Sequence, residues 1–242
     1  MATTATATAT GVGAEAPSPA RFLLLGDSHA GCVGRAARAA DLPFAGGPIG
    51  SGRDFLGPFC APGGADGTDV TFKDAEADRL YREALDALDV RALGALPVPL
   101  VCTFGLSLHT VATRQNWDVH RDPGGDLPEA FLRGPLFAAL VTAYVRGALA
   151  FYDRALALGL RVLAPLPPQR VPPMSDARVF TAAQEVLRTE LAARGVEIVD
   201  LRARVTDASG LQRRAFSQAD DPIHGNLAFG RLVVRALLDR GL

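Results

Sequence analysis

Short apolar segments of strand length alternate with longer segments of helical character along this chain. The strand-like segments cover residues 21–25, the Gly-rich stretch 43–52, and residues 99–104, 161–164 and 196–201. The helical segments cover residues 30–40, 74–93, 128–158, 175–194 and 226–238, with Gly195 placed to end the fourth of them. This alternation is typical of a parallel sheet covered by helices on both faces, so we predict an α/β fold.

Polar or turn-forming residues follow the strand-like segments. The motif Gly26-Asp27-Ser28-His29 follows the first segment, and the second segment itself ends in a glycine-rich loop. Gly105 follows the third segment and Pro165 follows the fourth. In parallel sheets, ligands bind outside the carboxyl ends of the strands. These residues are therefore expected to line one edge of the sheet.

Ser28 is the candidate nucleophile, because it stands where a strand gives way to a loop. A serine hydroxyl needs a neighbouring imidazole, held in one tautomer by a carboxylate, to become reactive. The segment Asp221-Pro222-Ile223-His224 near the chain end offers both groups. We predict that His224 is the base and that Asp221, in preference to Asp220, orients it.

Length and charge narrow the class of protein. With 242 residues of which 48% are hydrophobic, one domain over residues 20–242 is expected, preceded by a low-complexity tail over residues 1–19. The 25 basic and 26 acidic residues nearly cancel, which argues against a nucleic-acid partner. The sequence has no apolar run of about 20 residues and no basic residue before Arg21, so neither membrane insertion nor secretion is expected, and a cytoplasmic location is predicted.

The three cysteines, Cys32, Cys60 and Cys102, are widely spaced and form no Cys-x-x-Cys pair. Neither a disulfide framework nor a structural zinc site is therefore predicted. Cys32 lies four residues after Ser28, and a half-buried helix cysteine is favoured there over a reactive thiol.

The order of these motifs resembles that of the SGNH (GDSL-type) hydrolases. The resemblance covers residues 21–242: Gly-Asp-Ser after the first strand, glycines after the second, a glycine turn after the third and Asp-x-x-His before the last helix. It implies a flavodoxin-like three-layer α/β/α sandwich, with Ser28 as nucleophile, His224 as base and Asp221 as its partner. It also implies that the Ser28 backbone N–H binds the oxyanion.

The same resemblance implies two further oxyanion donors. One is a glycine N–H of the loop, for which Gly50 is chosen and Gly52 is nearly equivalent. The other is the asparagine of a Gly-x-Asn motif, but here Gly105 is followed two residues later by Ser107. A hydroxyl donates one hydrogen bond and reaches less far than an amide. Ser107 is therefore expected to be a weakened donor, with His109 as the alternative.

The leading function is then cleavage of a carboxylic ester or thioester through an acyl-enzyme on Ser28. The expected partner is a small acylated molecule, with no metal and no organic cofactor. Two alternatives stay open: an acyltransferase that uses the same three residues, and a non-catalytic binding module that keeps the fold.

The segment 113–122 is dense in polar side chains. His109, Asp118 and His120 match no metal-ligand spacing, so a surface loop is favoured, with a substrate-covering insertion as the functional alternative. Trp117 is predicted to be either an aromatic wall or a core anchor. Arg114 and Arg121 could hold an anionic group, although solvated arginines are the commoner case, and Arg213-Arg214 is assigned to a solvated turn.

Overall fold

A computed structural model describes residues 19–221 and 223–242 of the chain. The predicted low-complexity tail, residues 1–19, therefore lies outside the described residues except for residue 19, and Pro222 also lies outside them.

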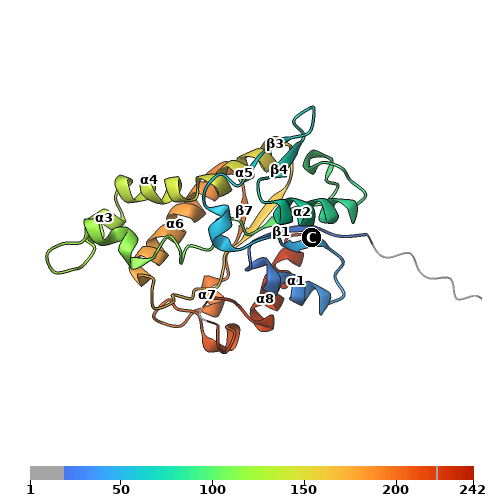
Figure 1. Cartoon of the computed structure of the whole chain (residues 1–242). Coiled ribbons are helices and arrows are strands. Elements are labelled where there is room, and N and C mark those ends of the chain that lie inside the picture. Colours follow the sequence, from blue (N-terminus) through green and yellow to red (C-terminus); the bar gives the residue numbers. More distant parts are fainter. Residues whose placement is uncertain (1–18, 222) are drawn as a thin grey trace, which may run out of the picture.

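The centre of the molecule is a five-stranded parallel sheet (Figure 1). Its strands are β1 (Leu23–Gly26), β2 (Ala45–Pro48), β5 (Leu100–Cys102), β6 (Val162–Pro165) and β7 (Glu197–Val199). The order across the sheet is β2-β1-β5-β6-β7, and every pair of neighbours is parallel. This is the flavodoxin-type order: β2 is added on one side of β1, and the later strands are added on the other side. The predicted α/β fold is confirmed.

Helices cover both faces of the sheet. One face carries α1 (Ala30–Arg38) and α8 (Leu227–Leu238), and the other carries α2 (Ala75–Asp86), α5 (Arg146–Ala157) and α6 (Ala177–Arg194). Side chains of β1 alternate between them: Leu24 packs in the α1–α8 core, while Leu23 and Leu25 pack in the opposite core. Figure 1 shows the two helical layers on opposite sides of the strands.

Shorter elements complete the fold. A two-stranded antiparallel hairpin is formed by β3 (Cys60–Gly63) and β4 (Asp69–Phe72). The remaining α-helices are α3 (Glu129–Leu132), α4 (Pro135–Tyr144) and α7 (Arg202–Val205). Four 3₁₀ turns occur at η1 (Gly52–Phe55), η2 (Leu93–Ala95), η3 (Arg114–His120) and η4 (Arg214–Phe216).

Several predicted boundaries need correction. The helical stretch 128–158 is interrupted twice, at the extended Gly134 before Pro135 and at Val145. The helix predicted to run to residue 93 ends at Asp86. It cannot continue to residue 93 because Asp89 has a positive φ of 55°, which lies outside the α-helical region. The hairpin was not predicted. Gly195 does end α6, with the left-handed φ of 95° expected of a glycine cap.

The first helix lies close against the last. A Cβ at Gly230 of α8 would overlap the carbonyl oxygen of Cys32 in α1, so glycine permits this approach. Cys32 is buried, its Sγ donates to the His29 carbonyl at 3.2 Å, and burial raises its pKa to about 12. These features agree with the predicted structural role and not with a reactive thiol. Cys60 and Cys102 are also free thiols.

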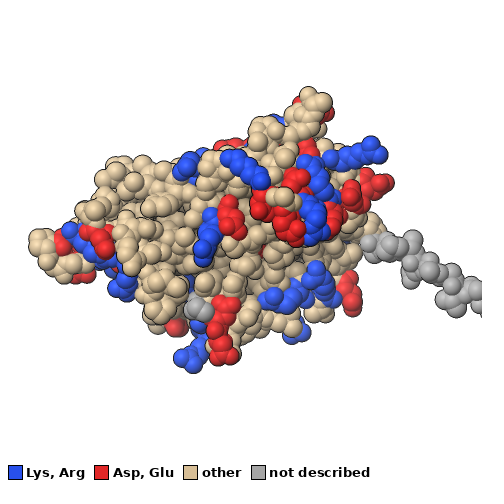
Figure 2. Space-filling model, viewed as in Figure 1, with Lys and Arg blue, Asp and Glu red and all other residues tan. Residues whose placement is uncertain are grey.

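The surface carries interspersed charges over α2, where Arg79 pairs with Glu76 and Glu83 (Figure 2). In contrast, α4 contains no charged residue. Within the described residues no single helix is long and apolar enough to cross a membrane; α4 and α5 meet the length and composition criteria only as a pair bent by 75°.

Asp69 is expected to be a major contributor to stability. Its buried carboxylate accepts hydrogen bonds from the Tyr81 hydroxyl at 2.5 Å, from the Leu93 N–H at 3.1 Å and from the Arg82 guanidinium. Burial alone would raise the pKa of Asp69, but these hydrogen bonds outweigh burial and lower it. Asp69→Asn should therefore reduce the free energy of unfolding by about 3 kcal/mol at neutral pH, measured by urea denaturation.

The pH dependence of this effect follows from the sign of the shift. Because the folded-state pKa of Asp69 lies below the unfolded value of about 3.9, its stabilisation is complete above that value and is lost as pH falls through the folded pKa. The gap between wild type and Asp69→Asn should narrow below about pH 4. The exposed Asp86→Asn is the control and should change stability by less than about 0.5 kcal/mol. Equal losses in the two variants would contradict the prediction.

Candidate functional site

Ser28 lies at the carboxyl edge of the sheet, immediately after β1. The strand ends at Gly26, where a Cβ would overlap the Thr103 hydroxyl of the neighbouring strand end. The chain then turns, and α1 begins at Ala30, with the Gly31 N–H donating to the Ser28 carbonyl at 3.1 Å. Ser28 therefore sits at the point where β1 lies between β2 and β5, which is where ligands bind in sheets of this order.

Asp221 organises the segment that carries His224. Its Oδ1 accepts the N–H groups of Ile223 at 2.8 Å and His224 at 3.0 Å, while its Oδ2 lies 2.6 Å from Nδ1 of the His224 ring. Burial would raise the pKa of Asp221, but these hydrogen bonds outweigh it and lower the pKa. One carboxylate thus fixes both the backbone turn and the imidazole.

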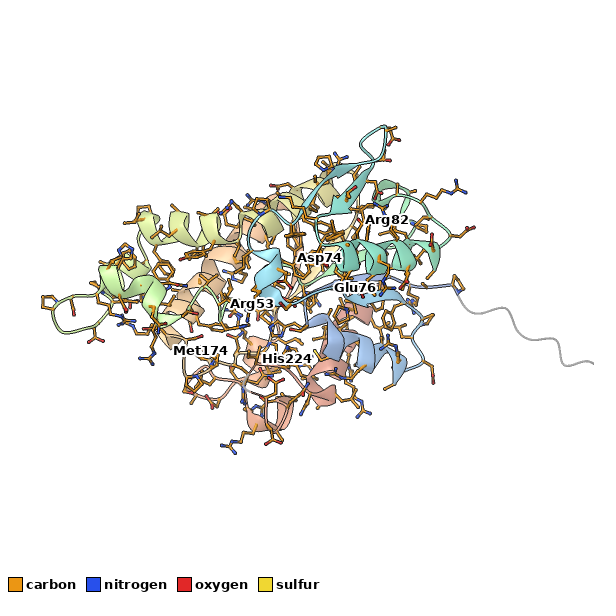
Figure 3. All side chains as sticks on the ribbon, viewed as in Figure 1. Arg53, Asp74, Glu76, Arg82, Met174 and His224 are labelled. Carbon is orange, nitrogen blue, oxygen red and sulfur yellow. The ribbon has the colours of Figure 1, made fainter. Side chains whose placement is uncertain are left out.

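The nucleophile and base candidates meet across 196 positions of sequence. Nε2 of His224 lies 2.7 Å from Oγ of Ser28. In the tautomer of the neutral ring that donates Nδ1–H to the Asp221 carboxylate, Nε2 is the acceptor of a hydrogen bond from the Ser28 hydroxyl. The structure therefore brings together the three residues singled out from sequence, and Asp221, not Asp220, contacts the ring. His224 is labelled in Figure 3.

Asp27 is a residue of the site that the sequence analysis left without a role. Its carboxylate is fully buried and accepts the His29 N–H at 2.9 Å, the Thr103 hydroxyl at 3.1 Å and the Ser107 hydroxyl. It therefore ties the turn that carries Ser28 to the end of β5. The available signal was the acidic residue directly before the candidate nucleophile, but two of its three donors, Thr103 and Ser107, come from a distant segment.

Ser107 is placed differently from expectation. Its hydroxyl donates its single proton to Asp27, and its side chain is only 1% exposed. That proton is not free for an oxyanion, so we do not retain Ser107 as a side-chain donor. Its position instead supports the buried Asp27 carboxylate.

The glycine loop can now be placed relative to the site. Gly52 is buried, and a Cβ there would overlap the Ser107 side chain and lie 3.4 Å from the Asp27 carboxylate. Gly50, the choice made from sequence, is exposed and lies against the Phe55 ring. The structure therefore favours the alternative, Gly52, as the loop residue beside the site.

Two backbone donors remain for a ligand. Ser28 N–H donates to no acceptor in residues 19–221 and 223–242. Gly52 is the first residue of η1, so its N–H has no acceptor within that turn. The N-terminal end of α1 adds a partial positive charge near Ser28. The combination suits a developing negative charge on an oxygen.

Two further histidines lie near His224. His29 is buried, its ring centre is 5.2 Å from that of His224, and its Nδ1 has no hydrogen-bond partner among residues 19–221 and 223–242. Burial lowers the pKa of His29 and lowers that of His109 to about 4, so both imidazoles are neutral near pH 7. Of the two, His29 lines the same cavity as Ser28.

The polar segment 113–122 is partly core. Trp117 is 1% exposed, donates from Nε1 to the Val111 carbonyl at 2.8 Å and packs 4.9 Å from the Phe137 ring, so it is the predicted core anchor. Arg121 pairs with Asp118 and Asp176. Across residues 19–221 and 223–242, no three His, Cys, Asp or Glu side chains gather as a metal site would require.

Solved structures with similar folds cover most of the chain. One, a proposed platelet activating factor from Streptococcus pneumonia, aligns at a TM-score of 0.50 with 12% identity, over 92% of this chain and 84% of that one. A proposed SGNH hydrolase from Slackia heliotrinireducens aligns at 0.48 with 14% identity (92% and 98%). A proposed acylhydrolase from Bacteroides fragilis also aligns at 0.48 with 14% identity (93% and 88%).

No family model matches the chain, and no curated protein matches its sequence. The structural likenesses therefore concern the fold alone. The strand order β2-β1-β5-β6-β7 and the likeness at a TM-score of 0.50 confirm the predicted α/β fold, with a flavodoxin-like parallel sheet covered by helices on both faces.

Restoring an asparagine at position 107 is expected to fail. Ser107 lies against Gly52 and Asp27 with almost no exposed surface, so the larger amide would overpack the site. Ser107→Asn should lower stability by about 2 kcal/mol and should not raise esterase activity. Ser107→Ala is the variant for comparison: its smaller side chain fits the site, but it removes one hydrogen-bond donor to the Asp27 carboxylate. A more active, equally stable Ser107→Asn protein would show that the side chain has room and a useful reach.

Proposed function

We propose that this protein is a serine hydrolase that cleaves carboxylic esters or thioesters of small acylated molecules. The observation that carries the proposal is the continuous hydrogen-bond chain from the Ser28 hydroxyl through the His224 ring to the Asp221 carboxylate, with contacts of 2.7 Å and 2.6 Å. Such a chain is the arrangement that activates a serine for attack on an acyl carbon.

In the proposed reaction, Ser28 Oγ forms a bond to the acyl carbon while His224 Nε2 takes the hydroxyl proton. The resulting imidazolium is stabilised by Asp221, whose lowered pKa keeps it ionised. The oxyanion is held by the N–H groups of Ser28 and Gly52. His224 then gives its proton to the leaving oxygen or sulfur as that bond breaks, and a water deprotonated by His224 releases the acid.

Covalent labelling tests the proposal. An alkyl fluorophosphonate should add to Ser28 Oγ with loss of fluoride, and mass spectrometry should locate the label on the peptide that contains Ser28. Ser28→Ala should abolish both labelling and hydrolysis of 4-nitrophenyl acetate. Ser209→Ala, which alters an exposed serine bonded to Asp207, is the control and should label normally. Labelling that persists in Ser28→Ala would refute the assignment.

A further inference from the structure

A small cavity opens directly beside the proposed nucleophile. It has a volume of about 210 Å³, and Ser28 and His224 contribute to its wall together with His29, Arg35 and Gln218. This volume equals that of roughly seven liquid waters. The cavity therefore has room for a small substituent.

The position of Arg35 follows from the geometry of α1. Side chains on a helix lean toward its N-terminus, and Arg35 Nη1 accordingly lies near Gly31, 3.4 Å from where a Cβ would stand. Since Gly31 is three residues after Ser28, the guanidinium is carried back toward the nucleophile. Arg35 forms no ion pair with any carboxylate in residues 19–221 and 223–242.

The other polar groups of the wall are hydrogen-bond donors or neutral. Gln218 contributes an amide, and His29 a buried neutral imidazole whose Nδ1 has no partner among the described residues. No carboxylate of the described residues lines the cavity: Asp221 lies behind the wall and is directed to the His224 ring, and Asp27 accepts the His29 N–H. A cation with neutral donors on the wall itself is suited to an anionic oxygen group.

The cavity borders the group that protonates the leaving oxygen. The leaving oxygen must lie near His224, because His224 returns the proton to it. Since His224 lines this cavity and the loop residue Gly52 does not, the cavity is open to a group attached to the leaving oxygen.

We propose that the cavity is a leaving-group subsite for an anionic substituent, and that Arg35 selects esters whose alcohol part carries a carboxylate or phosphate. This proposal rests on the proposed hydrolase function and names the substrate class of that site.

The test compares two acetyl esters that differ in charge and little in shape, 3-acetoxybenzoate and its neutral methyl ester, methyl 3-acetoxybenzoate. Acetate release from each is followed by chromatography, and the measured quantity is the ratio of their kcat/KM values. Wild type should prefer the anionic ester, and Arg35→Gln should lower the ratio about fivefold, the upper end expected for loss of an ion pair at an exposed side chain. High salt should weaken the wild-type preference.

The chain offers a matched control. Arg38 lies one turn further along α1, is exposed and stacks its guanidinium 5.2 Å from the Phe44 ring, away from this cavity. Arg38→Gln removes the same charge from the same helix and should leave the ratio within about twofold of wild type. Arg53 follows Gly52 on η1 and does not line this cavity, so Arg53→Gln tests a basic residue of the glycine loop instead.

Several outcomes would overturn the proposal. These are an equal fall in the ratio for Arg35→Gln and Arg38→Gln, a fall only in Arg53→Gln, or a wild-type enzyme that hydrolyses the methyl ester at least as well as the anion. The proposed function itself fails separately, if neither ester is hydrolysed and the fluorophosphonate does not label Ser28.

Discussion

Removing the imidazole of His224 should lower the acylation rate by about 10⁴- to 10⁶-fold. Without it, no group accepts the Ser28 proton across the 2.7 Å contact, and the hydroxyl at neutral pH is a poor nucleophile. His224→Ala should therefore show almost no burst of 4-nitrophenol from 4-nitrophenyl acetate and very slow fluorophosphonate labelling. Its circular dichroism should match wild type, because the side chain is partly exposed and is not part of either hydrophobic core.

The two neighbouring aspartates provide the control for this reaction. Asp221→Asn replaces the acceptor of Nδ1–H by an amide that can favour the wrong tautomer, and it should cost roughly 10³–10⁴ in rate. Asp220→Asn removes the same charge from an exposed residue next to it, and should cost less than about threefold. If the two variants lose similar amounts, the carboxylate acts through its charge alone and the Asp221–His224 hydrogen bond is not used.

Ser28, Asp221 and His224 could be predicted from the sequence because each is fixed by local structure. Ser28 follows directly from the end of a strand, and a single Asp-x-x-His turn holds Asp221 and His224 together. Their meeting then follows from a general property of parallel sheets, whose strand ends share one edge. The alternation of apolar strands with helices similarly predicts the fold.

The details that sequence analysis missed depend on contacts between distant segments. Whether Ser107 points at the oxyanion or at Asp27 is decided by how the segments that follow β1 and β5 pack, and Asp27 and Ser107 are 80 positions apart. The hairpin strand Cys60–Gly63 contains Pro62 and Gly63, which are disfavoured in strands, so its pattern resembled a loop. In contrast, the helix break at Gly134-Pro135 had a local signal, because the residue before a proline avoids helical conformation.

The sequence also could not decide whether Gly50 or Gly52 donates its N–H to the oxyanion. The structure favours Gly52, and a substitution there is expected to cause a second large loss of activity. Gly52→Ala should reduce kcat/KM about 10²- to 10³-fold, the range for loss of one oxyanion donor. The new methyl group would overlap the buried Ser107 side chain, so the Gly52 N–H, the Ser107 hydroxyl or both must shift. Steady-state kinetics with 4-nitrophenyl acetate measure the loss, and fluorophosphonate labelling shows whether Ser28 still reacts.

Gly50→Ala is the matched comparison, since its methyl group would meet the buried Phe55 ring at 2.7 Å and neither Ser107 nor Asp27. This variant should therefore lose stability but retain at least about a third of wild-type activity. A large loss in Gly50→Ala with a small one in Gly52→Ala would restore Gly50 as the donor.

A double variant separates a steric effect from loss of the donor. Ser107→Gly removes the side chain that the Gly52→Ala methyl would strike, at the expense of one hydrogen bond to Asp27. If crowding against Ser107 causes the loss, Gly52→Ala combined with Ser107→Gly should be no slower than Ser107→Gly alone. If instead the two losses multiply, the sites act independently and the methyl group does not work through Ser107. The crowding explanation then fails, and the Gly52 N–H must be displaced by the backbone itself.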